Sequence, residues 1–262
     1  MKKLTLLLLI TLILTGCKTT QTELNSLQTI QEKGKMIVGF TNYPPLGFQN
    51  ETGETVGLDI EIAKEVAKRL GVSVEFQYID WDNKTFELNN KNIDMIWNGF
   101  TVTEEREKEV NFSKPYMDNQ IVIVSRVDTP IKTIDDLNDV DVAVETQSSG
   151  QLAIEKSSIF DSINSLQKYT SISDALLALN AKTVDAIIAD ITYAGYLQSQ
   201  NNNAYIISDE SFDSEYYAIG FRKQDDNALR DSIDAIIDDL IEDGTASEIS
   251  IKWLSKDLIR RP

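Results

Sequence analysis

The sequence predicts an α/β fold of two lobes, each with a mixed, mostly parallel sheet flanked by helices and joined to the other by two hinge strands. From Lys35 onward, apolar strand-like runs alternate with helical patterns, as in α/β layers. The break Asp128-Thr129-Pro130 follows an apolar β-branched run, and the alternation restarts behind it, so we expect a second lobe there. The chain has 262 residues, 42% of them apolar, enough for one large domain or two of ordinary size.

The elements before this break follow from the spacing of apolar residues. The stretch 58–70 has an apolar helical face that includes Ile60 and Ala63, and Gly71 supplies its stop. Short apolar runs predict strands. The predicted elements here are strand 36–40, helix 58–70, strand 72–78, a short helix after Trp81, strand 93–97 and strand 120–125.

The elements behind the break follow from the same patterns. The segment 228–242 is amphipathic, and Gly244 ends it. The other predicted elements here are a helix near Asp135, strand 140–144, a helix from Gly150, helix 173–181, strand 186–189, helix 191–200 and strand 216–222.

The N-terminus has the pattern of an export signal. Lys2 and Lys3 precede an apolar run over 4–14, which is the length of a signal-peptide core and too short to span a bilayer. The run ends in Thr15-Gly16-Cys17, which resembles the bacterial lipobox, where the cysteine receives a lipid and the peptide is cut just before it. The alternative is an ordinary signal peptide with an incidental cysteine.

The expected arrangement at the N-terminus is therefore a signal peptide over 1–16, lipidation of Cys17 and a flexible tether over 17–34, which is rich in polar residues. The mature protein would be an exported lipoprotein at the outer face of the cell membrane, anchored through this lipid.

The composition excludes several classes of function. Asp and Glu number 42 against 25 Lys and Arg, and the formal charge of −17 argues against nucleic acid, whose phosphates are held by cations. The chain has no histidine, so it has no Ser-His-Asp or Cys-His nucleophile. Cys17 is the only cysteine, which excludes internal disulfides and multi-thiolate metal sites. An enzyme would have to use carboxylates, Lys, Tyr or hydroxyls.

Several motifs along the chain from Lys35 to Leu258 resemble one family. They are Asn42-Tyr43-Pro44-Pro45, the helix from Gly57-Leu58-Asp59 to Val66, the run from Asp94 to Arg106, Phe112-Ser113-Lys114-Pro115-Tyr116, Ile219-Gly220-Phe221-Arg222-Lys223 and Asp243-Gly244-Thr245 before Trp253. The family is that of the extracellular solute-binding proteins, family 3, which have the type-2 periplasmic-binding fold and serve polar amino-acid ABC transporters.

The resemblance implies a site for an amino-acid zwitterion. Both ends need partners when the zwitterion leaves water, because an unpaired buried charge is costly. Arg106 is implied as the carboxylate partner, since its planar fork gives two parallel hydrogen bonds, although its charged surroundings alone favour a solvated arginine. The family also uses the position of Thr101, through its backbone N–H and hydroxyl, and backbone groups of Asn98 or Gly99.

The second lobe is expected to supply the other ligand contacts. Asp190 stands where a strand ends and a helix begins, and the resemblance makes it the acceptor for the ligand ammonium, alongside or instead of an N-cap role. Ser148 and Ser149 match a Ser/Thr pair that donates to the ligand carboxylate. Gln147 stands where a glycine is usual, so the shape of that turn departs from the family pattern.

Selectivity for the ligand side chain depends on residues that could also be structural. Tyr43 and Trp81 resemble two aromatics that sandwich the ligand stem, yet both could be ordinary core. Glu145 follows a strand and either enters the pocket, where an ionised carboxylate accepts but does not donate hydrogen bonds, or faces solvent. Phe40 and Thr41 stand where binders of basic amino acids often carry an aspartate, which argues against a ligand limited to lysine or arginine. We therefore expect a neutral polar or cationic ligand, with glutamine or arginine ahead of glutamate or aspartate.

The predicted function is capture of a polar amino acid by closure of the two lobes and delivery to an ABC transporter permease. Lobe one would comprise 35–118 and 217–262, lobe two 122–207, and the hinges 119–121 and 208–216. The protein is expected to be a monomer, and no cofactor or metal is implied.

Two other functions remain open at this point. The same fold resembles a dehydratase of aromatic amino-acid precursors (cyclohexadienyl or arogenate dehydratase) and the front domain of some murein lyases, which need a cleft carboxylate free for acid or base work. The resemblance instead implies that Asp190 pairs with the ligand ammonium and is not free for acid or base work. A sensory ligand-binding module is the other alternative, and it would normally continue into a membrane span and a signalling domain.

Overall fold

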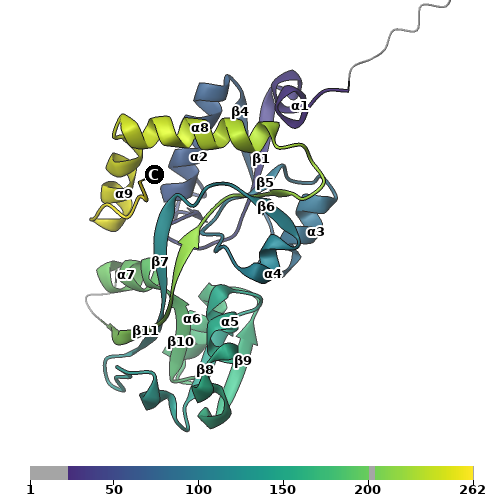
Figure 1. The fold of residues 1–262 in the computed structure, drawn as a ribbon. Helices are drawn as coiled ribbons and strands as arrows, with labels where there is room; N and C mark the ends of the chain where they lie inside the picture. The colour runs from purple at the N-terminus through teal and green to yellow at the C-terminus, as the bar shows by residue number, and fades with distance from the viewer. Residues whose placement is uncertain (1–22, 201–203, 262) are drawn as a thin grey trace, which may run out of the picture.

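The computed structural model describes residues 23–200 and 204–261, and they contain two five-stranded sheets (Figure 1). Each sheet is covered by its own helices, and the long strands β7 (Met117–Arg126) and β11 (Tyr205–Tyr217) run between the two halves. The predicted two-lobed α/β fold is therefore confirmed. The predicted signal peptide 1–16 and Cys17 lie outside the described residues.

The first lobe is built on the sheet β4-β1-β5-β12-β6, in which β1 is parallel to β4 and β5, and β12 is antiparallel to β5 and β6. Its strands are β1 (Lys35–Phe40), β4 (Ser73–Tyr78), β5 (Met95–Ile96), β6 (Val110–Phe112) and β12 (Gly220–Arg222), with a small hairpin of β2 (Phe48–Gln49) and β3 (Thr55–Val56). Its helices are α1 (Ser26–Lys33), α2 (Leu58–Leu70), α3 (Lys84–Asn89), α4 (Glu104–Glu107), α8 (Ala228–Glu242) and α9 (Thr245–Leu254), with a 3-10 turn at Trp81–Asn83.

The second lobe is built on the sheet β11-β7-β10-β8-β9. β8 is parallel to β9 and β10, whereas β7 is antiparallel to β10 and β11. Its other strands are β8 (Asp141–Glu145), β9 (Ser165–Tyr169) and β10 (Ala186–Asp190), and its helices are α5 (Ser149–Lys156), α6 (Ile172–Asn180) and α7 (Ile191–Gln200), with 3-10 turns at Asp135–Leu137 and Ser158–Ser162.

The cores follow the apolar patterns of the sequence. One cluster of buried apolar side chains runs from the first lobe, at Met36 and Val38, into the second, at Ile187 and Tyr193. A second cluster lies within the second lobe, and a third surrounds Trp81. None of the helices within residues 23–200 and 204–261 combines the length and the apolar character needed to cross a bilayer.

The predicted tether over 17–34 is wrong in its C-terminal part, because helix α1 occupies Ser26–Lys33. Asn25 and Gln28 form a capping box, Ile30 is buried, and Gly34 ends the helix with a φ of 70°. Ser26 also bonds the Asp226 carboxylate, which ties the helix to the segment before α8. The polar composition concealed these local signals.

Two further predictions of secondary structure need correction. The predicted strand 93–97 is reduced to Met95–Ile96. The predicted strand 216–222 is divided between the end of β11 and β12, which belong to different sheets. The predicted hinges 119–121 and 208–216 lie within the continuous strands β7 and β11, which pair with each other there. Their role as hinges stays a prediction.

Gly57 fixes the start of α2. Its φ of 137° lies in a region that favours glycine, and a Cβ would overlap the Leu46 carbonyl oxygen and lie 2.9 Å from the Gly47 backbone nitrogen. These are backbone atoms, so a rotamer change cannot relieve the overlap.

We expect Gly57→Ala to lower the free energy of unfolding by about 3 kcal/mol or more, measured by urea denaturation. Gly195→Ala in α7 is the matched control, because no atom lies within 4 Å of its added Cβ. The control is expected to be neutral or stabilising by up to about 1 kcal/mol. Equal stabilities of the two variants would contradict the steric argument.

Candidate functional site

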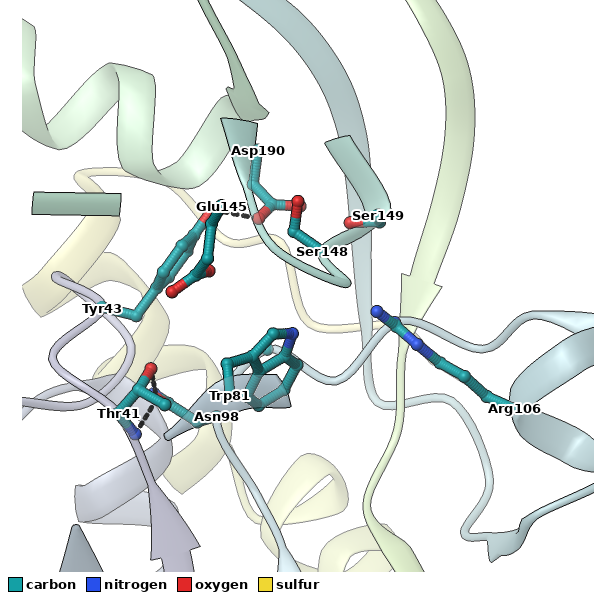
Figure 2. A pocket seen from close by; sticks show the side chains of 10 residues that line it. Thr41, Tyr43, Trp81, Asn98, Arg106, Glu145, Ser148, Ser149 and Asp190 are labelled. Atoms are coloured by element: carbon teal, nitrogen blue, oxygen red, sulfur yellow. Dashed lines mark hydrogen bonds between the residues drawn. The ribbon is translucent and has the colours of Figure 1, made fainter. Parts of the chain in front are cut away.

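A narrow cavity of about 10 Å³ lies between the two lobes, and side chains from both lobes point into it (Figure 2). Its lining residues are Thr41, Tyr43, Trp81, Asn98, Gly99, Arg106, Glu145, Ser148, Ser149 and Asp190. The cavity therefore brings together every predicted site residue except Thr101. That they contact a ligand stays a prediction.

The lining residues lie at the carboxyl ends of parallel strands. Thr41 and Tyr43 follow β1, Trp81 follows β4, and Asn98 follows β5. In the second lobe, Glu145 is the last residue of β8, with Ser148 and Ser149 shortly behind it, and Asp190 is the last residue of β10. Ligands of open α/β sheets gather at such strand ends, so the topology itself concentrates polar groups in this cavity.

A buried aspartate holds the loop after β5. Asp59 in α2 accepts hydrogen bonds of 2.7 Å from the Gly99 backbone N–H and from the Tyr116 hydroxyl. Burial raises the pKa of Asp59 to about 7, and these two hydrogen bonds oppose the rise. In the same loop the Asn98 side-chain oxygen accepts from the Thr41 backbone N–H at 2.8 Å. The first-lobe wall of the cavity is thus fixed by bonds from its own side chains.

Arg106 is buried, with 7% of its surface exposed, so its interpretation as a solvated arginine is wrong. One Nη donates to the Thr101 carbonyl at 2.8 Å and the other to the Gln147 carbonyl of the second lobe at 3.0 Å. Its Cζ lies 4.9 Å from the centroid of the Phe100 ring. Burial lowers the pKa of Arg106 to about 10, and nearby carboxylates, Glu215 first among them, oppose this. The guanidinium stays charged at neutral pH.

Asp190 faces Arg106 from the other lobe and is equally buried. Its carboxylate accepts hydrogen bonds from the Tyr43 hydroxyl and the Asn119 side-chain amide. Burial raises the pKa of Asp190, while those two bonds and Arg106 lower it. The cavity thus holds a cation from one lobe and an acid from the other.

Glu145 is 4% exposed and lines the cavity, so its interpretation as a solvent-facing acid is wrong. Burial, followed by the charge of Asp190, raises the pKa of Glu145 to about 8. Figure 2 shows its carboxylate on the side of Thr41 and Trp81, away from the Arg106 guanidinium. A polar position for the distal end of a ligand side chain is therefore available there.

The two aromatic residues are both core and lining. Tyr43 packs against Tyr193, with ring centroids 5.3 Å apart, and Trp81 meets Phe100 edge-on at 5.5 Å. Both are buried, as core residues are, and both border the cavity, while their contact with a ligand stem stays a prediction.

The turn before α5 takes the shape that the family's usual glycine would favour. Gln147 has a φ of 57°, in the left-handed region. Ser148 is the N-cap of α5, and its hydroxyl accepts from the Gln151 backbone N–H at 3.1 Å. Gln147 therefore adopts the left-handed conformation expected of glycine, and its Cβ makes this conformation strained.

Sequence reasoning missed two residues near the predicted Thr101, which are Asn119 and Glu215. Thr101 is not a lining residue, but its hydroxyl is 3.4 Å from that of Ser149, which lines the cavity, and donates to Glu215 at 3.1 Å. Asn119 and Glu215 lie opposite each other on β7 and β11. Separated by 96 positions, they carry no local signal that joins them. Within residues 23–200 and 204–261, no group of three or more acidic or thiol side chains is placed to hold a metal.

The sequence profile of the bacterial extracellular solute-binding proteins, family 3, matches residues 36–256. The arginine-binding extracellular protein ArtP of Bacillus subtilis is 31% identical over 97% of this chain and 99% of its own length. The L-cystine-binding protein TcyJ of Escherichia coli K12 is 28% identical over 89% and 88%. The crystal structure of an ABC uptake transporter substrate-binding protein from Streptococcus pneumoniae with bound histidine superposes with a TM-score of 0.86, at 30% identity, over 90% of this chain and 99% of that one.

We expect Gln147→Gly to raise the free energy of unfolding by about 1 kcal/mol, because glycine adopts the left-handed conformation without a Cβ clash. Urea denaturation measures it. Gln147→Ala is the control and should give no such gain, since it keeps the Cβ. A gain in the alanine variant as large as in the glycine variant would contradict the strain argument.

Proposed function

The chain belongs to the bacterial extracellular solute-binding proteins of family 3, and we propose that it captures a polar amino acid between its lobes and delivers it to an ABC transporter permease. The observation that carries the proposal is the pairing of opposite charges across one buried cavity, Arg106 from the first lobe and Asp190 from the second. Relatives named as binding proteins, rather than as enzymes, support a binding function.

The two charges match the two ends of an amino acid. The two hydrogen bonds of Arg106 use two of the five N–H groups of a guanidinium, which leaves donors for a ligand carboxylate. Ser148, Ser149 and the Thr101 hydroxyl would add neutral donors at this end. Asp190 would accept from the ligand ammonium, and Tyr43 and Trp81 would pack along the stem between the two ends.

Closure of the lobes would complete the site. Each lobe supplies one of the two charges, so a zwitterion is fully paired only when both lobes reach it. We propose segments 119–121 of β7 and 208–216 of β11 as the hinges. Binding energy would then favour the closed arrangement, which is the form that a permease can distinguish from the open one.

The cell-surface location belongs to the same proposal. Residues 1–16 would be removed as a signal peptide and Cys17 would carry the lipid, with the segment before α1 as the tether. The monomer would stand at the outer face of the membrane, where it meets the permease.

The charges at the distal end favour a ligand that donates hydrogen bonds. Glu145 lines that end, and Asp190 and Glu215 lie near the charged pole, so acids outnumber Arg106 around the cavity. Burial raises the pKa of Glu145 to about 8, so a cationic side chain would favour its ionised form and pair with it, whereas an acidic side chain would keep it protonated. The relative named for arginine and the solved structure with bound histidine have ligands whose side chains contain N–H donors, which supports the same class.

A thermal-shift screen of the common amino acids and cystine tests the function itself. A ligand at a hundredfold excess over its dissociation constant adds about 2.7 kcal/mol to the free energy of unfolding, which gives a clear shift. We expect glutamine or arginine to shift the melting temperature more than glutamate or aspartate. No shift with any amino acid would contradict the proposal.

Arg106→Ala and Asp190→Ala are each expected to weaken ligand binding by about 2–5 kcal/mol, because each leaves one ligand charge buried without a partner. Titration calorimetry measures the loss. The neighbouring pair Arg230, which is partly buried, and Asp231, which is exposed, lies in α8 and supplies matched controls, and alanine at either position should leave affinity unchanged. Near-normal affinity of the Arg106 and Asp190 variants would remove these residues from the site.

Glu145→Gln is expected to reduce the preference for cationic over neutral ligands, and Glu145→Lys to shift selectivity toward acidic ligands by reversing the charge. Competition titrations with arginine, glutamine and glutamate measure both changes. Glu248→Lys, at an exposed position of α9, controls for the change in net charge. Tight glutamate binding that is indifferent to both substitutions at Glu145 would contradict this assignment.

A further inference from the structure

Glu215 is an acidic residue at the junction of the lobes that neither the sequence motifs nor the cavity lining include. It lies on β11 directly opposite Asn119 of β7. Its carboxylate accepts from the Thr101 hydroxyl of the first lobe at 3.1 Å and from the Asn119 amide at 3.5 Å. The same Asn119 amide nitrogen also donates to Asp190. Glu215 is thus connected to both charged poles of the site.

This junction has more acceptors than donors. One amide nitrogen serves both Asp190 and Glu215, and the Asn119 side-chain oxygen is buried with no hydrogen-bond partner among the described residues. Buried acceptors without donors are unfavourable. A proton on Glu215 would reduce the negative charge and add a donor at this junction.

A ligand carboxylate would compete with Glu215 for its partners. In the proposed site the ligand carboxylate accepts hydrogen bonds from the Thr101 hydroxyl and from Arg106. The Thr101 hydroxyl now donates to Glu215, and Glu215 is the carboxylate that raises the pKa of Arg106 most. Two carboxylates that share the same donors are not both favourable in ionised form. Protonation of Glu215 removes this conflict.

We propose that Glu215 takes up a proton when the ligand carboxylate binds beside Thr101 and Arg106, so that affinity for the amino acid rises as the pH falls. The inference rests on the proposed amino-acid binding function. Glu215 acts here as a positioning residue, because it controls which acceptor the Thr101 hydroxyl and Arg106 serve.

The surrounding charges agree with titration near neutrality. Burial, followed by the charge of Asp190, raises the pKa of Glu215 to about 7, and the Thr101 hydrogen bond and Arg106 oppose the rise. The ligand carboxylate would raise this pKa further. The ligand ammonium acts in the opposite direction, but it would pair with Asp190, whereas the carboxylate takes the hydroxyl that Glu215 itself uses. Proton uptake on binding means tighter binding at low pH.

Glu215 also has a route for proton exchange apart from the ligand cavity. It is half-buried and borders a second cavity of about 380 Å³, which shares no lining residue with the first. The charged residues on this side are Asp118, Lys256 and Arg260, and Asp118 pairs with Arg260 at 2.7 Å. A proton can therefore reach Glu215 without opening of the lobes.

Titration calorimetry at pH 6, 7 and 8, in buffers of different ionisation enthalpy, counts the protons taken up on binding. The probes are L-arginine and L-glutamine, whose side chains do not titrate in this range. We expect net proton uptake near pH 7 and affinity about threefold to tenfold higher at pH 6 than at pH 8. Glu215→Gln should remove most of this uptake and flatten the pH dependence.

Asp118→Asn is the matched control, since it alters an acid of the second cavity whose carboxylate pairs with Arg260 and not with Thr101 or Asn119, and it should keep the pH dependence of the unmodified protein. Glu145 also has a raised pKa and could take up or release protons on binding. The proton count of each variant is therefore compared with that of the unmodified protein, because Glu145 contributes equally to both. Binding with an unchanged proton count in Glu215→Gln would overturn this inference alone. Failure of every amino acid to bind would overturn it together with the proposed function.

Discussion

Arg106 and Asp190 are charges of opposite sign, each buried, and each held by a different lobe of the protein. A buried charge is tolerated only with hydrogen bonds and a counter-charge, so the rest of the site can be understood as the support of these two groups. Thr101 and Gln147 supply carbonyl acceptors to the guanidinium, and Tyr43 and Asn119 supply donors to the carboxylate. The two lobes are thereby joined through polar contacts rather than through apolar packing alone.

The strand order places these groups within reach of each other. The parallel strands of both sheets end at the junction, and residues directly behind them form the cavity wall. The wall is then stiffened from behind, because Asp59 fixes Gly99 and the Asn98 amide fixes Thr41. Such preorganisation lowers the ordering cost of binding, since the ligand finds its partners already oriented.

The sequence predicted correctly those helices whose position is determined by interactions between neighbouring residues. The helices 58–70, 191–200 and 228–242 agree with α2, α7 and α8, because each has an apolar face or clear ends in the sequence. Helix α1 was missed because its polar sequence is stabilised by the capping of Asn25 and by its contact with Asp226, almost 200 positions away.

The site shows the same division. Its motif residues follow strands and could be placed by order alone, whereas Asn119 and Glu215 become neighbours only through the pairing of β7 with β11. The sequence of one strand does not indicate which distant strand it pairs with, so the proximity of Asn119 and Glu215 could not be predicted.

The groups proposed for the ligand also bond each other across the junction. Arg106 bonds the Gln147 carbonyl, the Tyr43 hydroxyl bonds Asp190, and the Thr101 hydroxyl lies within 3.4 Å of that of Ser149. A ligand that used these groups would exchange some of these bonds for its own, so its affinity would reflect a difference between two sets of contacts rather than the sum of new ones. This exchange would discriminate among ligands. An amino acid would pair both Arg106 and Asp190, whereas a ligand with one charged end would leave one of them poorly paired, at the cost of that buried charge.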